Sequence, residues 1–288
     1  ANSFSRIYGA FNPVFTASYA GLVGGDTPSV VTGLQFSTTA TIRSGVGAYA
    51  ITPFGASATG YGITYVAGLL TINPADLTIR ANDFTRFYGS DNPTFTASYN
   101  GLVAGDTASV VSGLSLATAA VKGTGVGEYA ITASGASAAN YNISYLPGKL
   151  TIDKAPLTIT ADNQSKTYGA ANPTLTATYT GLVNNETPAV VSGLTLGTAA
   201  TTSSGVGNYD ITISGGSAAN YAISYGAGNL TINPATLTVR ADNQTRFYGD
   251  ANPTLTGTIN GFVLGQNESV LTSLPTYATS AGLTTGVG

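Results

Sequence analysis

The chain has 288 residues, of which 43% are hydrophobic and 8% are charged, and its formal net charge is −3. The hydrophobic content excludes a disordered chain, and ten scattered lysine and arginine residues provide no basic stripe for nucleic acid. Cysteine and histidine are absent, which excludes disulfides, thiol nucleophiles and imidazole bases and removes the common transition-metal ligands.

One motif recurs four times at a spacing of 80 residues, and its second copy comprises Tyr88, Gly89, Asn92 and Pro93. Glycine, asparagine and proline are typical of turns, and the segment that follows alternates with the period of a strand. We interpret the motif as a turn that feeds a strand. A ligand loop built on Asp91 and Asn92 is the weaker interpretation, because the acid is absent from the equivalent position of the other copies.

The constant period predicts tandem copies of one structural unit. We expect repeat 1 at 1–76 without its first strand, complete repeats 2 and 3 at 77–156 and 157–236, and a partial repeat 4 at 237–288. Because the chain begins and ends inside a repeat, we expect it to be part of a longer array.

The elements predicted for repeat 2 are, in chain order, strands at 77–79, 85–87 and 94–99, a helix at 107–111, and strands at 114–118, 127–132, 141–145 and 149–152. A polar pair, Asn82 and Asp83, interrupts the first strand. The helix is short, of about two turns at most, and starts at a threonine that is followed by proline in two of the copies. This order predicts a mainly β, β-grasp-like module, with an immunoglobulin-like β-sandwich as the alternative.

The junctions between repeats contain Pro74, Pro156 and Pro234 and leave about four residues between strands, which predicts stiff connectors. We therefore expect the repeats to stack end to end as a rod of roughly 110–160 Å, with neighbouring repeats as partners. Replacing 153–156 by four glycines should then loosen the rod and leave the melting of each repeat nearly unchanged. The side chains expected to make contact beyond the connectors are Leu77, Leu157 and Leu237.

Sixteen of the 17 tyrosines fall on five positions of the repeat, which indicates roles in the core and in sheet packing. Tyr145 and Tyr225, near the ends of predicted hairpins, are the candidates for contact with a glycan. The Gly125-Val126-Gly127 triplet precedes a strand instead of a helix, so it predicts a turn or bulge and no nucleotide loop.

Asp26, Asp106 and Glu186 precede the predicted helix in their repeats, where an acid favours the helix start and could also meet Arg6, Arg86 or Lys166 of the same repeat. No carboxylate pair recurs for acid–base catalysis, and no calcium-binding loop is present. We predict no catalytic residue, no metal ligand and no cofactor.

The Tyr-Gly-x-x-Asn-Pro motif, the run that begins at Gly101-Leu102-Val103 and the closing segment from Ala139-Asn140-Tyr141 resemble the MBG/YDG-type repeats of large secreted bacterial adhesins. Such repeats occur in filamentous-haemagglutinin-like proteins and biofilm matrix adhesins. The resemblance implies secretion, an extracellular location on the bacterial outer surface, a β-grasp-like module and a repetitive stalk. It also suggests binding of mucin or another glycan.

Two functions follow as hypotheses. The first is a structural stalk that projects an adhesive domain for cell–cell, biofilm or host attachment. The alternative is a multivalent array that binds a polysaccharide or a host glycan and gains affinity from its repetition. An enzyme is not expected, and no apolar run approaches the roughly 20 residues that a membrane-spanning helix needs.

Overall fold

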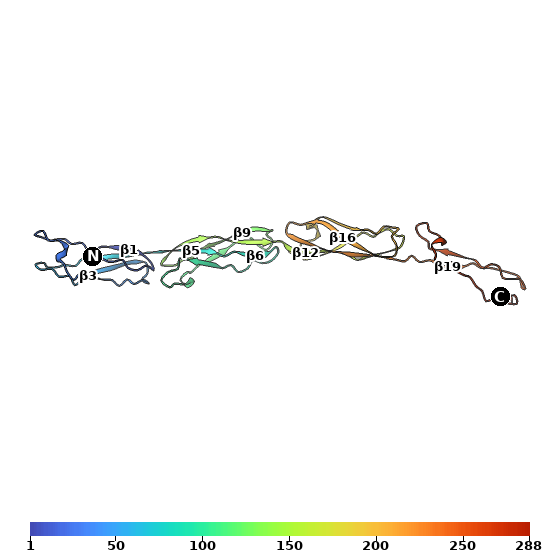
Figure 1. Ribbon diagram of the computed structural model, residues 1–288, viewed down its shortest axis with the longest axis horizontal. Coiled ribbons are helices and arrows are strands. Elements are labelled where there is room, and N and C mark those ends of the chain that lie inside the picture. The colour runs from blue at the N-terminus through green and yellow to red at the C-terminus, as the bar shows by residue number, and fades with distance from the viewer. The chain divides into compact units, whose positions relative to one another are not determined.

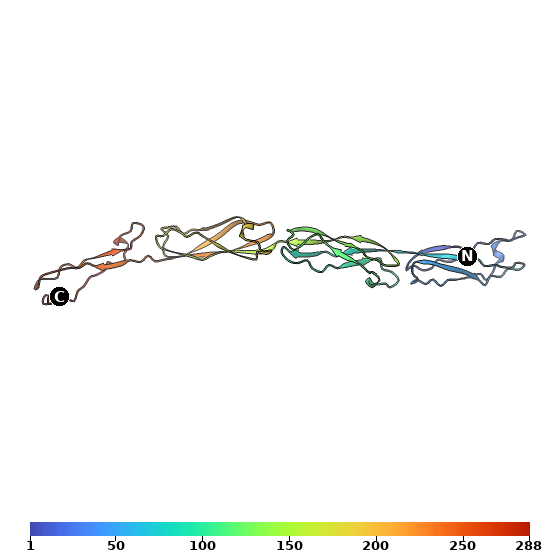
Figure 2. The same ribbon diagram turned by 180° about the vertical axis from the view of Figure 1, so that it is seen from behind.

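The computed structural model describes residues 1–288 and divides into two compact units, Ala1–Asp153 and Lys154–Gly288. Figures 1 and 2 show the strands of each unit from opposite sides. The strands of the first unit are β1 (Phe4–Ile7), β2 (Gln35–Ser37), β3 (Gly47–Phe54), β4 (Gly68–Asn73), β5 (Ala75–Ala81), β6 (Phe84–Phe87), β7 (Ala97–Asn100), β8 (Ser115–Ala117), β9 (Gly127–Ser134), β10 (Tyr141–Leu146) and β11 (Gly148–Asp153).

The second unit repeats this order. Its strands are β12 (Ala155–Ala161), β13 (Gln164–Thr167), β14 (Ala177–Thr180), β15 (Ser192–Thr198), β16 (Gly207–Ser217), β17 (Tyr221–Gly226), β18 (Gly228–Asn233), β19 (Thr238–Ala241) and β20 (Gly257–Asn260). The helical segments of both units are the 3-10 turns η1 (Pro28–Val30), η2 (Ala108–Val110), η3 (Pro188–Val190) and η4 (Glu268–Val270).

Repeat 2 forms two sheets, with the strand orders β10-β5-β7 and β6-β11-β9-β8. The predicted interruption of the first strand at 82–83 is confirmed, because the chain leaves one sheet at the end of β5 and enters the other at β6. β5 runs parallel to β10 and antiparallel to β7. β6 runs parallel to β11, which in turn pairs antiparallel with β9.

The core of repeat 2 lies between these two sheets. Leu77 and Ile79 of β5, Ile131 of β9, and Leu150 and Ile152 of β11 are at most 1% exposed. Their neighbours along each strand are more exposed, as the two-residue period of a strand requires. β5 lies against β9 and β11 of the other sheet. Burial of each side chain contributes roughly 1.5–3 kcal/mol, so this layer is the main source of the repeat's stability.

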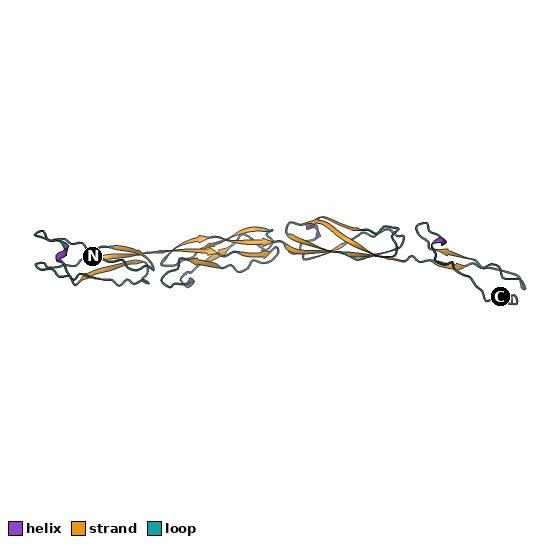
Figure 3. Cartoon of the chain, in the orientation of Figure 1, coloured by secondary structure: helices purple, strands orange, loops and turns teal.

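The repeat is mainly β, as predicted, and its two sheets face each other as in a β-sandwich. The immunoglobulin-like character of the alternative stays a prediction. The β-grasp-like module is not confirmed. The predicted helix is a single 3-10 turn of three residues, closed by hydrogen bonds from the N–H groups of Val110 and Val111 to Thr107 and Ala108 (Figure 3). No helix is long and apolar enough to cross a membrane.

Repeat 3 has the same two sheets, ordered β14-β12-β17 and β13-β18-β16-β15, whereas repeats 1 and 4 hold fewer strands. Repeat 1 forms the sheet β1-β4-β3-β2, and repeat 4 forms a pair of β19 with β20. Residues 61–66 correspond to β10 but lie outside any strand. In repeat 2 the corresponding strand β10 pairs with β5.

Candidate functional site: the junction between repeats

The asparagine of the recurrent motif fixes a buried cation inside its own repeat. Arg86, which is 6% exposed, donates from Nε to Oδ1 of Asn92 at 2.7 Å and from Nη2 to the carbonyl of Val121 at 2.7 Å. Asn92 donates in turn to the carbonyl of Ala120 at 2.7 Å. The motif therefore ties the end of β6 to the loop before β9, and Pro93 follows directly after this anchor.

Repeats 1 and 3 also bury a cation at this position, and in repeat 3 Asn172 donates to the carbonyl of Ala200 without binding the cation. Arg6 donates to Asn12 in repeat 1, and in repeat 3 the Lys166 ammonium donates to the carbonyls of Ala170 and Thr201. The partners of these buried cations are neutral oxygens, so their hydrogen bonds have to offset the cost of burying the charge. The sequence-based suggestion that Asp106 could meet Arg86 is wrong, since Arg86 is held by Asn92 and carbonyl groups.

Asp106 lies instead beside a tyrosine. The hydroxyl of Tyr141 donates to Oδ2 of Asp106 at 2.7 Å and accepts the N–H of Val103 at 3.0 Å. The side chain of the cap residue Thr107 bonds with the hydroxyl of Ser109 at 2.8 Å and accepts no backbone N–H of the 3-10 turn, and the first turn contains no acid. The interpretation of Asp106 as a helix-start residue therefore does not hold. Its carboxylate organises the loop before η2 through the tyrosine.

In the first unit, the tyrosine of the recurrent motif in repeat 1 completes this arrangement. The hydroxyl of Tyr8 donates to the same Oδ2 atom of Asp106 at 3.1 Å. The ring of Tyr8 meets that of Tyr141 edge to face, with centroids 5.6 Å apart and an interplanar angle of 80°. Such a geometry is favourable for aromatic pairs. One carboxylate of repeat 2 thus accepts two phenols, one from each repeat.

The glycine of the motif is required at the same contact. A Cβ atom on Gly9 would lie 2.5 Å from Cγ2 of Val103, and the φ angle of Gly9 is +81°. Any larger residue would therefore push against repeat 2 and also strain the backbone. Beside it, the N–H of Val46 donates to Oδ1 of Asn140 at 2.9 Å, so the Gly-Val-Gly triplet of repeat 1 also contacts repeat 2.

The apolar core is continuous across the junction. A single buried cluster contains Tyr8, Ile51 and Ile72 of repeat 1 together with Leu77 and Tyr141. The expected burial of Leu77 beyond the connector agrees with this, since the residue is 0% exposed.

The connector itself is shorter than predicted. Pro74 alone separates β4 from β5, and Lys154 alone separates β11 from β12. Pro156 lies inside β12, where it pairs with Ala222. The expected four-residue connector is found only between β18 and β19, at 234–237. Where both repeats have their strands, the last strand of one leads almost directly into the first strand of the next.

The environment of the junction keeps both phenols neutral. Burial is the largest cause that raises the pKa of Tyr141, with a further contribution from Asp106, and the pKa reaches about 12. Burial and the hydrogen bond to Asp106 likewise raise the pKa of Tyr8. Neutral hydroxyls remain donors to the carboxylate, so the junction is a hydrogen-bonded contact that the approach of one repeat to the next desolvates.

The second unit contains an equivalent contact between repeats 3 and 4. Gln266 stands at the position of Asp106 and donates from Nε2 to the hydroxyl of Tyr168 at 2.8 Å. A Cβ atom on Gly169 would lie 2.6 Å from Cγ2 of Val263, as at Gly9. Because the donor and the acceptor exchange roles, the junction tolerates an amide in place of the acid.

Sequence reasoning placed these motifs in separate roles and missed that they converge. The signal was present: the Tyr-Gly pair and the Gly-Val-Gly triplet occur in every copy, the acid at 106 recurs as Asp26 and Glu186, and the Asn140-Tyr141 pair recurs as Asn220-Tyr221. Residues repeated for packing within one copy and residues repeated for contact between copies have the same period. Only coordinates separate the two groups.

Tyr145 and Tyr225, the candidates for glycan contact, are half-buried. Tyr145 is 36% exposed, and its hydroxyl accepts the N–H of Ala136 at 2.8 Å. Tyr225 is 43% exposed, and its hydroxyl donates to the carbonyl of Gly215 at 2.7 Å. Tyr145 thus ties its strand to the segment after β9, and Tyr225 ties its strand to β16, while part of each ring remains open to solvent.

No curated protein matches the chain. Among solved structures it is similar to Drosophila N-cadherin EC1-3, with 6% sequence identity, a TM-score of 0.25, and coverage of 81% of this chain and 98% of that one. The family model described as MBG domain (YGX type) matches residues 1–71, 77–151, 157–231 and 237–288. The matched segments together span nearly the whole sequence, and the chain therefore belongs to the MBG domain (YGX type) family, as four tandem copies.

Proposed function

We propose that the chain is a structural stalk segment of a bacterial cell-surface adhesin. The observation that carries this proposal is the junction within the first unit, where residues at repeated positions join one repeat to the next. Tyr8, Gly9 and Val46 of one repeat meet Val103, Asp106, Asn140 and Tyr141 of the next. A sequence that repeats its contact residues in this way fixes the angle between neighbours, as a spacer must.

The stalk would project an adhesive domain for cell–cell, biofilm or host attachment. The family match supports a tandem-repeat role, and the absence of cysteine suits a chain that is exported unfolded and placed outside the cell. Antibody labelling of intact, unpermeabilised cells that produce the full-length protein tests the extracellular location. We further propose that the repeats have no enzymatic activity, since no recurrent pair of acid and base is available.

Small-angle scattering of the 288-residue chain tests the stalk directly. We expect an extended profile for the wild type and a shorter maximum dimension for Gly9→Ala, which forces Val103 away from the junction. Gly21→Ala is the matched control: its φ angle is +85°, close to that of Gly9, but a Cβ atom there would meet nothing within 4 Å. A compact wild-type profile, or equal effects of the two substitutions, would contradict the proposal.

A glycan-binding array is the second candidate, and the observation that favours it is the exposed part of the ring at one position of the repeat. Tyr65, Tyr145 and Tyr225 are 42%, 36% and 43% exposed. Aromatic rings of this kind can stack on sugars. Titration of the chain with mucin glycans or bacterial exopolysaccharide, followed by calorimetry, tests this function. Binding by the wild type that is lost in the Tyr145→Ala, Tyr225→Ala double variant would support it.

A further inference from the structure

In repeats 1, 2 and 3, the strand at the position of β6 and the last strand are direct neighbours, and they run parallel. In repeat 2, Phe84–Phe87 of β6 pair with Leu150–Asp153 of β11. The same pairing joins β1 to β4 in repeat 1 and β13 to β18 in repeat 3. In repeats 2 and 3 the chain enters through β5 or β12 and continues into the first strand of this pair, and it leaves the repeat just after the second strand. The parallel pair therefore lies on the path from entry to exit.

This topology decides how a repeat responds to tension. Two parallel strands have their starting ends on the same side, so pulling the entry backward and the exit forward slides one strand along the other. Sliding loads the evenly spaced hydrogen bonds of a parallel pair together. Pulling the same strands apart from one end would load those bonds one after another. The repeat is thus oriented to resist force along the chain.

The segment that leads into β6 is also held by the other sheet of the repeat. Before it reaches β6, the chain passes through β5, which lies between β10 and β7 and pairs with both along its length. The end of β5 also packs closely against the start of β11, because a Cβ atom on Gly148 would lie 2.4 Å from the carbonyl oxygen of Ala81. Tension on the entry must therefore draw a strand out from the centre of a sheet as well as shear the parallel pair.

Each parallel pair is also closed at both of its ends. At the start, a side-chain oxygen accepts the N–H of the residue that follows the first glycine of the last strand. This acceptor is Asp83 for Lys149 at 2.8 Å, Asn163 for Asn229 at 2.8 Å, and Ser3 for Leu69 at 3.1 Å. At the other end, the backbone N–H groups of Tyr8, Tyr88 and Tyr168 donate to the backbone carbonyls of Asn73, Asp153 and Asn233, each at 2.8 Å.

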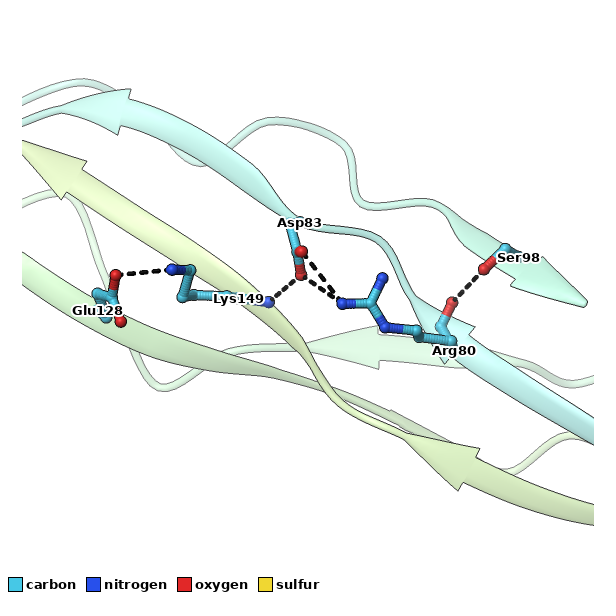
Figure 4. Close-up of polar contacts among 5 residues, drawn as sticks. All are labelled: Arg80, Asp83, Ser98, Glu128 and Lys149. Carbon is cyan, nitrogen blue, oxygen red and sulfur yellow. Dashed lines mark hydrogen bonds and ion pairs between the residues drawn. The ribbon is translucent and has the colours of Figure 1, made fainter.

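Repeat 2 reinforces the start of its pair with charge. Figure 4 shows the carboxylate of Asp83 between the guanidinium of Arg80 and the backbone N–H of Lys149. Arg80 lies 3.1 Å from Asp83, and the Lys149 ammonium lies 2.7 Å from Glu128 on β9. The hydrogen bond from the Lys149 backbone is the largest cause that lowers the pKa of Asp83, followed by Arg80.

We propose that the parallel pairs β1/β4, β6/β11 and β13/β18 are mechanical clamps that bear tension along the chain, with residue 83 and its equivalents as their side-chain clasps. Resistance to tension would suit the proposed stalk, on which this inference rests, but it is a property of each folded repeat. The mechanical test can therefore be negative while the scattering profile is extended, and positive while that profile is compact.

Single-molecule force spectroscopy on the full chain tests the clamp, and the absence of cysteine allows handles at two chosen sites. Pulling between the termini should unfold repeat 2 by shear. Ser90 lies just after β6 and Asp153 is the last residue of β11, so both lie at the same end of the parallel pair. Pulling between Ser90→Cys and Asp153→Cys should peel the pair open at a force lower by roughly twofold or more. Equal rupture forces in the two geometries would overturn the proposal.

Substitutions test the clasp. Asp83→Ala removes the acceptor for Lys149 and should speed unfolding of repeat 2 under constant end-to-end force by roughly three- to tenfold, as expected for one lost hydrogen bond. Asp83→Asn, which introduces the residue found at 163, should restore the slow rate. Glu128→Ala is the control, because it removes an ion pair between β9 and β11 and leaves the parallel pair intact. Unfolding of Asp83→Asn as fast as that of Asp83→Ala, or a control as fast as either, would overturn the role of the clasp.

Discussion

At the scale of single residues, the tyrosine and the acid of each repeat form the contact on which the junction depends. The pair exists within one repeat, as Tyr61 donates to Asp26 at 2.7 Å in repeat 1. In repeat 2 the equivalent Tyr141 is 8% exposed, and Tyr8 of the preceding repeat lies against it. Docking of a neighbour thus adds a second phenol to a carboxylate that is already positioned.

The raised pKa of Tyr141 predicts how the first unit responds to alkali. Its folded-state value of about 12 lies above its ordinary 10.0, so its stabilisation is fully present below about pH 10 and is lost as the pH rises through about 12. We expect the free energy of unfolding to fall over this range, and to fall less in Tyr141→Phe. Denaturant unfolding at a series of pH values measures it, with Tyr145→Phe as the control. If the free energy of unfolding of Tyr141→Phe fell with pH as steeply as that of the wild type, the alkaline effect would not come from Tyr141.

At the scale of elements, β5 is the strand on which a complete repeat depends, because it is the centre of one sheet and lies against the other. It pairs parallel with β10 and antiparallel with β7, so both outer strands of this sheet depend on it.

Truncation of the central side chain of β5 should therefore be costly. Leu77→Ala leaves a cavity at a site that is 0% exposed and should lower the free energy of unfolding of the first unit by about 2–5 kcal/mol. Leu146→Ala in the neighbouring β10 is the matched control, since that leucine is 50% exposed and should cost about 0.5 kcal/mol or less. Equilibrium denaturation checks both, and similar losses would show that β5 is not central to the core.

At the scale of the whole molecule, a single residue separates β4 from β5 and β11 from β12 in the sequence. Replacing 153–156 by four glycines would alter the last residue of β11 and the start of β12, where Ala155 is 2% exposed. We therefore expect this change to destabilise the folded repeats by roughly 0.5–1 kcal/mol per glycine, contrary to the expectation from the sequence. The same replacement at 234–237, which lie outside strands, should cost less in thermal unfolding. Equal losses at the two sites would restore the idea of an independent connector.

The sequence by itself determined the repeat, the β-rich content, the interruption at 82–83 and the alternation that buries Leu77 and Ile79. These features depend on the period of the pattern and on local chemistry, and both can be determined from the sequence alone. The same local reasoning overestimated the helix, since the Thr-Pro signal specifies a helical start but not how far the helix continues.

Only the tertiary structure decided the division into two sheets, the one-residue junction and the partners of the polar side chains. Asp106 is the clearest case: its neighbours in sequence suggested a helix start, whereas its partners Tyr8 and Tyr141 lie far away along the chain. Arg86 likewise donates to Asn92 and to a backbone carbonyl, and not to an acid. Pairing between distant strands brings these groups together, and the free energy that selects it comes from burial and hydrogen bonding summed over the whole fold, which no local pattern records.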